Sequence, residues 1–378
     1  MMSLFSCYRN CHYRRKSLKA LKIKLVGFWD GGNENNIITK ILSQHYNIIH
    51  SDEPDWVICS VFPEYYSYTE YDCPRVMYCN ESSIPDFGIV DYAISYYKLH
   101  FEDRYFRYPG CMQSYQFSEN GEIIEIKKDY INHDDKSILK GKDIFCNYIY
   151  SNISENNIRE SFFEQLSNKY KTVASAGRHL NNMPDGKNLP PGGKIEFQKR
   201  CKFSIAFENT RISGYCTEKI REAFIANTIP IYYGDPYVKE IFNPDAFIDV
   251  SDYKDYDEVI DVIRRLDNDD KAYMKMLSAP MYVDENIIQN KYNELREFLF
   301  RIFDQDPADA IRRSNYAYAK EHNDRMLYFY TINKGGKSKF ILDLAYANQT
   351  GGGKEVMRCI KRKVINKTKK LLPFCNLL

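Results

Sequence analysis

The fold of this chain is decided by residues 201–234, which read CKFSIAFENTRISGYCTEKIREAFIANTIPIYYG. Apolar residues run together from Phe203 to Phe207 and again from Ile229 to Tyr233, and such runs predict two buried strands. Between them, Thr217 to Asn227 carries apolar residues at helical spacing, and Thr217 suits the N-cap. This order predicts a strand, a helix and a second strand that together form one crossover unit of a parallel sheet.

The predicted helix begins after a polar loop that runs from Glu208 to Cys216. In an open parallel sheet, ligands bind outside the carboxyl ends of the strands, and a helix N-terminus at that edge favours anions. Lys219 adds a positive charge, and the side chains of Asn209, Tyr215 and Glu218 can bind hydroxyl groups. The mixture favours a sugar nucleotide as ligand, although a capped surface helix that binds nothing explains the same pattern.

The first half of the chain shows the same alternation of strands and helices. Strands are predicted at Lys22 to Phe28, Trp56 to Phe62 and Arg75 to Cys79, with a helix over Asn36 to Tyr46. The third of these strands leads directly to Glu81, so this carboxylate lies at a strand's carboxyl end, where it can accept a proton. On position alone, a solvated loop acid or a helix cap explains Glu81 more simply.

A second α/β pattern begins at Asp143, after a polar, turn-rich linker. It includes a helix from Ser154 to Tyr170 with Arg159 near its start, and a helix from Pro236 with Asp235 as its cap. A long amphipathic helix from Glu285 to Phe303 could cross back to the first half. The predicted divisions are a basic segment over residues 1–21, an α/β domain with its linker over 22–142, a second α/β domain over 143–305, an extension over 306–353 and a basic amphipathic tail over 354–378.

Composition limits the classes of protein that fit. The 378 residues suffice for two domains, and the formal net charge of +2 gives no overall attraction to nucleic acid. The 11 cysteines include no metal-binding spacing, which favours a reducing compartment. Neither an apolar run long enough to span a membrane nor a signal peptide is evident, so a cytoplasmic location is expected.

Two short motifs suggest other chemistries and are set aside. The pairs Asp267/Asp269 and Asp304/Asp306 have the spacing of a metal-binding DxD motif, but both fall at predicted helix ends, where acidic caps are common. The run from Gly351 to Lys354 lacks the spacing and the Ser or Thr of a phosphate-binding P-loop. The motif therefore argues against a P-loop kinase or GTPase.

Three stretches, FENTRISGYCTEKIREAF and NTIPIYYGDP in or overlapping residues 201–234 and NPDAFIDVSDY after them, resemble the fucosyltransferases of glycosyltransferase family 10, the alpha-1,3/1,4 group, in their bacterial form. Weaker similarity extends the resemblance over about residues 22–305. It implies an α/β fold of the GT-B type, with two Rossmann-like domains facing across a cleft. The first domain would bind the acceptor and the second would bind GDP-fucose.

The resemblance also implies roles for individual residues. Arg159 and Lys219 would bind the donor diphosphate and stabilise its charge as it leaves, so no cofactor is required and a divalent metal would at most stimulate. Glu81 would remove a proton from the acceptor hydroxyl, which attacks the anomeric carbon from the opposite face and inverts its configuration. The remaining donor-binding residues would be Asn209, Tyr215 and Glu218.

The expected product is an alpha-linked fucoside on O3 of an N-acetylglucosamine-type residue of an oligosaccharide, in lipopolysaccharide or another surface glycan. The basic amphipathic pattern from Glu355 to Leu372 favours reversible contact with anionic lipid at the cytoplasmic face of the inner membrane, although a basic tail without a partner fits as well. Two other functions stay open: a two-domain transferase for another nucleotide sugar, and a sugar-binding descendant without catalysis.

Overall fold

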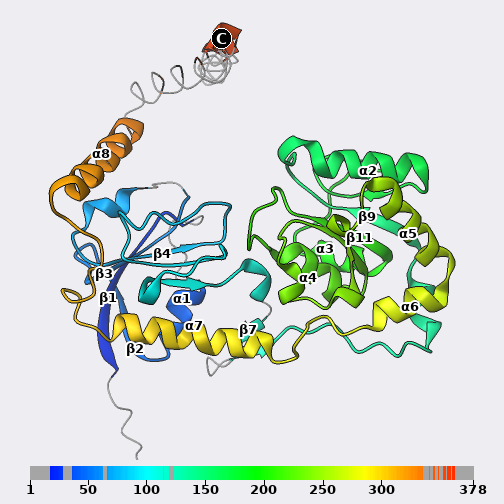
Figure 1. The fold of residues 1–378 in the computed structure, drawn as a ribbon, viewed down its shortest axis with the longest axis horizontal. Coiled ribbons are helices and arrows are strands. Elements are labelled where there is room, and N and C mark those ends of the chain that lie inside the picture. The colour runs from blue at the N-terminus through cyan, green and yellow to red at the C-terminus, as the bar shows by residue number, and fades with distance from the viewer. Residues whose placement is uncertain are drawn as a thin grey trace, which may run out of the picture.

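The computed structural model describes residues 18–28, 36–62, 66–113, 115–118 and 123–334, together with short helical pieces between residues 340 and 361. These residues build two parallel sheets with helices packed against them (Figure 1). The predicted α/β fold is therefore confirmed, and the two sheets lie in separate halves of the molecule.

The first sheet has six strands in the order β2-β1-β3-β4-β5-β6, and every neighbouring pair is parallel. Because the strands are parallel, their carboxyl ends share one edge of the sheet. The loop that carries Glu81 leaves β4 at this edge. The strands are β1 (Lys19–Val26), β2 (Tyr46–His50), β3 (Trp56–Cys59), β4 (Arg75–Cys79), β5 (Tyr92–Ser95) and β6 (Tyr105–Arg107).

The second sheet has five parallel strands in the order β10-β9-β11-β12-β13. They are β9 (Ile144–Tyr148), β10 (Ala174–Ser175), β11 (Cys201–Phe207), β12 (Ile229–Tyr233) and β13 (Ile248–Asp249). Five helices belong to this half of the chain: α2 (Ile158–Lys169), α3 (Gly193–Lys199), α4 (Glu218–Ile225), α5 (Tyr256–Asn268) and α6 (Asp270–Ser278).

The predicted crossover unit is β11, α4 and β12. Phe203 in β11 lies beside Ile229 in β12 in parallel register. Helix α4 buries Ile220, Ala223 and Phe224, which are the apolar residues that define its predicted inner face. The burial of these strands agrees with their continuous apolar sequence, since strands covered on both faces need no polar alternation.

Helix α7 (Ile287–Phe303) crosses back to the first sheet, so it leaves the second half although its residues fall within the predicted domain 143–305. In Figure 1 this yellow helix runs along the first half of the molecule, beside α1 (Ile37–Leu42). The Tyr46 hydroxyl donates to the Asp304 carboxylate at 2.5 Å, and the rings of Trp56 and Phe303 lie 4.5 Å apart. Aromatic packing thus fixes the helix to the first sheet.

The segment after α7 also belongs to the first half. The buried Asp91 carboxylate accepts the backbone N–H of Arg312 at 2.7 Å and that of Arg313 at 2.9 Å, and pairs with the Arg313 guanidinium. Helix α8 (Ala317–Lys334) follows and approaches the first domain through His322, whose Nε2 lies 3.2 Å from an Asp86 oxygen. The chain therefore leaves the first domain, builds the second and returns.

Some local predictions were wrong. No α-helix begins at Pro236; a single 3-10 turn covers Val238–Glu240. The Asp235 carboxylate is buried and accepts the backbone N–H groups of Gly214 at 2.7 Å and Tyr237 at 3.0 Å, so it joins two loops instead of capping a helix. The predicted linker contains a hairpin of β7 (Tyr115–Phe117) and β8 (Ile123–Glu125).

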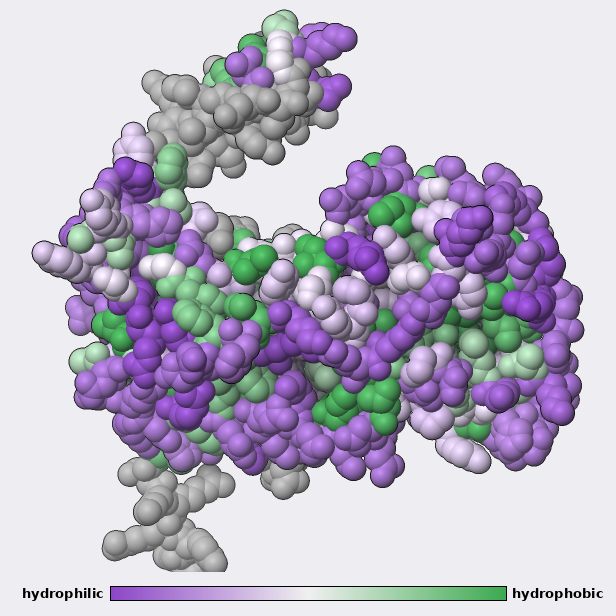
Figure 2. All heavy atoms as spheres, viewed as in Figure 1, coloured by the Kyte–Doolittle hydropathy of each residue, from purple (hydrophilic) through white to green (hydrophobic). Residues whose placement is uncertain are grey.

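Hydrophilic side chains cover most of the visible face of both halves, while hydrophobic ones form smaller groups (Figure 2). Among the described residues, no helix combines the length and the apolar character needed to cross a bilayer. Most of the predicted amphipathic tail, including Val364 and Leu371, lies outside the described residues.

Candidate active site

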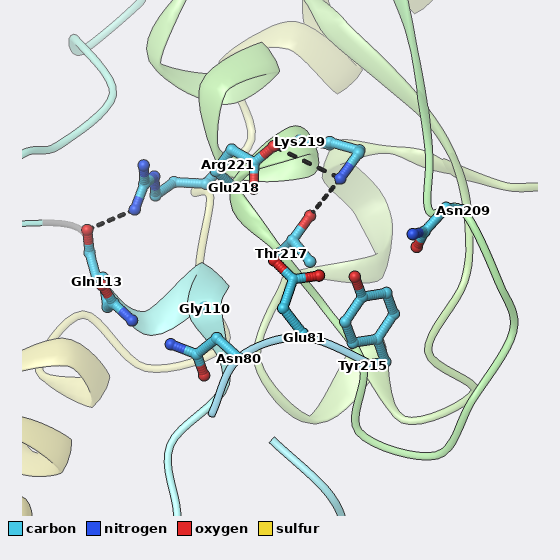
Figure 3. A pocket seen from close by; sticks show the side chains of 10 residues that line it. All are labelled: Asn80, Glu81, Gly110, Gln113, Asn209, Tyr215, Thr217, Glu218, Lys219 and Arg221. Atoms are coloured by element: carbon cyan, nitrogen blue, oxygen red, sulfur yellow. Dashed lines mark hydrogen bonds and ion pairs between the residues drawn. The ribbon is translucent and has the colours of Figure 1, made fainter. Parts of the chain in front are cut away.

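A cavity of about 430 Å³ lies where loops of the two domains meet. Its lining residues from the first domain follow β4 or β6, and those from the second surround the start of α4 (Figure 3). Five of the six predicted site residues lie together here, although they come from distant parts of the sequence. The lining consists of Asn80, Glu81, Gly110, Gln113, Asn209, Tyr215, Thr217, Glu218, Lys219 and Arg221.

The loop before α4 is held against the first domain by its backbone. Gly214 has a φ of +84°, and a Cβ at this position would lie 2.3 Å from the Tyr96 carbonyl oxygen. The Cys216 carbonyl accepts the Cys111 N–H at 3.0 Å, and the rings of Tyr96 and Tyr215 lie 4.9 Å apart. Only glycine permits so close an approach in this conformation, so Gly214 places Tyr215 at the domain interface.

Glu81 reaches the cavity from the first domain. It is exposed, and its carboxylate points toward the hydroxyl groups of Thr217 and Tyr215 (Figure 3). The strand end before it is fixed by the Tyr78 hydroxyl, which accepts from Asn80 Nδ2 at 2.9 Å and from Gln113 Nε2 at 2.6 Å. An accessible carboxylate on a fixed strand end can take a proton from a bound hydroxyl.

Lys219 is the cation at the start of α4. Its Nζ lies 3.0 Å from Glu208 Oε2, 2.7 Å from the Thr217 hydroxyl and 3.4 Å from Glu218 Oε1. Burial lowers the pKa of Lys219, but the charges of Glu208 and Glu218 outweigh burial and hold this pKa above its usual value. The ammonium is therefore charged at neutral pH and available to an anionic ligand.

Glu218 and Tyr215 differ in the charge that they carry. Burial raises the pKa of Glu218, but the nearby charges of Lys219 and Lys194 lower it more, so the net shift is downward. Burial raises the pKa of Tyr215, so its phenol stays neutral. The Glu218 carboxylate can thus accept hydrogen bonds from hydroxyl groups, and the Tyr215 hydroxyl can both donate and accept them.

Arg159 is the one predicted site residue that does not line the cavity. It is buried near the start of α2, where its Nε donates to the Glu208 carbonyl at 3.3 Å. Its guanidinium lies 4.3 Å from the centre of the Tyr150 ring. Arg159 therefore contacts the backbone of Glu208, which does not line the cavity but precedes the lining residue Asn209 in the sequence.

Several residues of the site escaped the sequence analysis. Thr217 occupies the predicted N-cap, but its hydroxyl donates to Glu208 at 2.7 Å and makes no capping bond. Glu208 follows a buried strand and could have been singled out on that ground. Gln113 and Arg221 carry no local signal, because they meet only across the interface, where Arg221 donates to the Gln113 carbonyl.

The DxD-like pairs serve structural roles. Asp267 pairs with Lys202 at 2.6 Å, and Asp269 accepts two backbone N–H groups at the start of α6. Asp304 accepts the Tyr46 hydroxyl. Within the described part of the chain, no group of three or more His, Cys, Asp or Glu residues is arranged to hold a metal ion.

Two family models match the sequence in regions that coincide with the two domains. The model of glycosyltransferase family 10 (fucosyltransferase), C-terminal part, matches residues 139–290. The model of the alpha-(1,3)-fucosyltransferase FucT N-terminal domain matches residues 23–114. Together the two matches cover well over half of the chain.

Individual relatives agree with the family models. The alpha-(1,3)-fucosyltransferase FucT of Helicobacter pylori is 32% identical over 301 residues, which are 69% of this chain and 60% of that protein. Alpha-(1,3)-fucosyltransferase B of Drosophila melanogaster is 27% identical over 46% of this chain and 41% of its own length. The chain thus matches less than two thirds of the length of these relatives.

Solved structures support the fold. A crystal structure of an alpha1,3-fucosyltransferase is 29% identical, with a TM-score of 0.64 over 80% of this chain and 94% of that one. A structure of an alpha1,3-fucosyltransferase with GDP-fucose is 28% identical, with a TM-score of 0.59 over 75% and 92%. The chain has the GT-B-like fold of these proteins and belongs to glycosyltransferase family 10, the fucosyltransferases.

Proposed function

We propose that the chain is an inverting alpha-1,3-fucosyltransferase that moves L-fucose from GDP-beta-L-fucose to O3 of an N-acetylglucosamine-type residue. One observation carries the proposal: the cavity between the domains brings the exposed carboxylate of Glu81 opposite the charged groups at the start of α4. A base on one side and a cation on the other are what a displacement at the anomeric carbon requires.

The second domain supplies the donor half of the site. As the bond between fucose and GDP breaks, negative charge develops on the diphosphate. Lys219, one of the two cations among the described residues that line the cavity, is proposed to stabilise this charge. Arg159 is proposed as the second cation on the family resemblance, and its Nε donates to the carbonyl of Glu208, which precedes the lining residue Asn209. Asn209, Tyr215 and Glu218 are assigned to the hydroxyl groups of the donor.

The first domain supplies the acceptor half. In the proposed step the acceptor oxygen forms a bond to the anomeric carbon while its proton passes to Glu81. The bond to the diphosphate breaks on the opposite face, so the beta-linked donor yields an alpha-linked product. The exposed position of Glu81 agrees with this role, since the acceptor must reach the carboxylate from solvent.

Side chains are proposed to stabilise the negative charge of the leaving group. We therefore expect that no cofactor is required and that a divalent metal is at most stimulatory. The proposed acceptor is an oligosaccharide on a lipid carrier, as in lipopolysaccharide, or on another surface glycan. The proposed location is the cytoplasm, with peripheral attachment to the inner membrane through the basic tail.

One experiment tests the proposal as a whole. Purified protein is incubated with GDP-fucose and a panel of N-acetylglucosamine-containing oligosaccharides, and the products are analysed for mass and linkage. Fucose on O3 supports the proposal, whereas fucose at another position rejects only the linkage.

The two other functions predict different outcomes. A transferase for another sugar would be stabilised against heat by GDP-mannose or a UDP-sugar more than by GDP-fucose. A descendant without catalysis would bind GDP-fucose and transfer nothing.

A further inference from the structure

Glu208 is a buried carboxylate next to the site, in contact with two lining residues, Thr217 and Lys219, and the proposed chemistry does not use it. Its side chain is 0% exposed, although it follows the last residue of β11 and adjoins the cavity. Placing an ionised carboxylate in the interior is costly unless partners compensate for the lost water. The identity of those partners therefore indicates what the residue is for.

Each oxygen of this carboxylate has a partner at the start of α4. Oε1 accepts the backbone N–H of Thr217 at 2.7 Å. Oε2 accepts the Thr217 hydroxyl at 2.7 Å and the Lys219 ammonium at 3.0 Å. Thr217 and Lys219 both line the cavity, so the compensation comes from the site itself.

The main chain of Glu208 contacts the other proposed cation. Its carbonyl accepts from Arg159 Nε at 3.3 Å, and its own N–H donates to the Tyr233 carbonyl at 2.8 Å. One residue therefore contacts both Arg159 and Lys219, through its backbone and its side chain respectively. A shift of Glu208 would move both cations.

The neighbouring strand leaves room for this arrangement. A Cβ at Gly234, just after β12, would lie 2.5 Å from Glu208 Cγ and 2.6 Å from the Tyr232 hydroxyl. Any larger residue at Gly234 would displace the carboxylate, so the space for Glu208 depends on a glycine that follows the adjacent strand.

We propose that Glu208 is a positioning residue, whose carboxylate holds the Thr217 hydroxyl and the Lys219 ammonium in the places from which they bind a nucleotide diphosphate. This inference rests on the proposed function of the cavity as a sugar-nucleotide site. It adds a residue that acts through Lys219 and touches neither the donor nor the acceptor.

A role of this kind changes how the site responds to pH. Lys219 also faces Glu218 at 3.4 Å and the Tyr150 phenol, whose pKa burial raises. Burial raises the pKa of Glu208 itself, and the groups that face it, besides Thr217, Lys219 and Glu218, are Tyr150, Tyr215, Tyr232 and Cys216. If the Glu208 charge is removed, burial pulls the pKa of Lys219 down with less opposition.

The test is Glu208→Gln, which keeps the size of the side chain and removes its charge. Calorimetry with GDP, from about pH 7 to about pH 9, should show a flat affinity for the wild type, because Lys219 stays charged. The variant should lose affinity as the pH rises, by up to about tenfold per pH unit once Lys219 loses its proton. At about pH 7 its kcat/KM for GDP-fucose should fall by roughly tenfold.

Two further variants show whether the alkaline loss of GDP affinity acts through Lys219. Glu208→Gln combined with Lys219→Arg should bind GDP without the alkaline loss, because arginine keeps its charge at these pH values. Asp267→Asn removes a matched carboxylate, which is 3% exposed and pairs with Lys202 at 2.6 Å, yet does not line the cavity. It should lower Tm and leave the GDP profile flat, which separates a positioning role from a purely structural one.

The inference is overturned if folded Glu208→Gln shows the flat GDP profile and the kcat/KM of the wild type. If that variant does not fold, Glu208→Asp takes its place: it keeps the charge but is one methylene shorter. It should show a flat profile with a lowered kcat/KM, and wild-type kcat/KM would overturn the inference. Wild-type protein that binds GDP but transfers no fucose would reject the proposed reaction alone, and failure to bind GDP would reject both.

Discussion

Replacing Lys219 by methionine is the most informative single change, because this residue has a proposed ligand-binding role and also pairs with the buried Glu208. In the structure its Nζ lies 3.0 Å from the fully buried carboxylate of Glu208 and only 17% of its side chain is exposed. Methionine keeps the apolar length of lysine and removes the charge. Lys219→Met should therefore weaken GDP binding and leave a buried carboxylate without its cation.

The size of each effect follows from these contacts. A charge-assisted contact with the diphosphate is worth about 1.5–3 kcal/mol, so the Kd for GDP should rise about 10- to 150-fold. Breaking one side of a buried ion pair costs about 3–5 kcal/mol. The two hydrogen bonds from Thr217 to Glu208 remain, so we expect the lower end, about 3 kcal/mol, at about pH 8.

The stability loss should depend on pH. In the wild type, burial raises the pKa of Glu208 and the charge of Lys219 opposes that rise, so its loss raises the folded-state pKa further. A carboxyl whose pKa is higher in the folded state binds more protons there, so the variant gains stability as the pH falls through this pKa. The loss in the free energy of unfolding of Lys219→Met, relative to the wild type, should be smaller at about pH 5 than at about pH 8.

Urea denaturation at both pH values and calorimetry with GDP would measure these effects. The matched control is Lys202→Met, because Lys202 is 16% exposed, pairs with the 3% exposed Asp267 and does not line the cavity. The control should lose stability but keep its affinity for GDP. Wild-type GDP affinity in folded Lys219→Met would refute the assignment of this lysine to the donor, and a deficit that does not change with pH would refute the account of Glu208.

Four further predictions test the proposed base, the second cation, the absence of a required metal and the membrane contact. Glu81→Gln should lower kcat about 100-fold or more and leave the Kd for GDP unchanged; a raised Kd with normal turnover would assign Glu81 to the donor instead. Arg159→Ala should raise the Kd for GDP-fucose by about tenfold or more, and wild-type kinetics would remove Arg159 from the site. Transfer should persist after dialysis against EDTA; loss of activity that Mg²⁺ or Mn²⁺ restores would show a required metal. Truncation after Asn348 should abolish sedimentation with anionic liposomes at low salt and preserve transfer to soluble acceptors, whereas unchanged sedimentation would place the membrane contact elsewhere.

Local sequence patterns were sufficient for much of the fold. The strand Arg75–Cys79 and the strand Ile229–Tyr233 have the predicted bounds, and α4 buries the predicted face. These features follow from apolar runs and helical spacing, which act over a few residues. Errors arose where a distant group decided the local structure, as at Asp235, whose carboxylate binds the Gly214 N–H and does not start a helix.

Apolar runs in the sequence locate the carboxyl ends of the strands and the side chains that follow them, and so they pointed to Glu81 and to the residues from Asn209 to Lys219. The packing of the two domains brings these two sets to one cavity and adds Gln113 and Arg221 to its lining, and it leaves Arg159 outside the lining, against the backbone of Glu208. Likewise, the return of α7 to the first sheet depends on contacts between Trp56 and Phe303, far apart in the sequence. The physical reason is that apolar periodicity specifies which face of an element is buried, whereas the neighbour that buries it is selected by packing between distant segments.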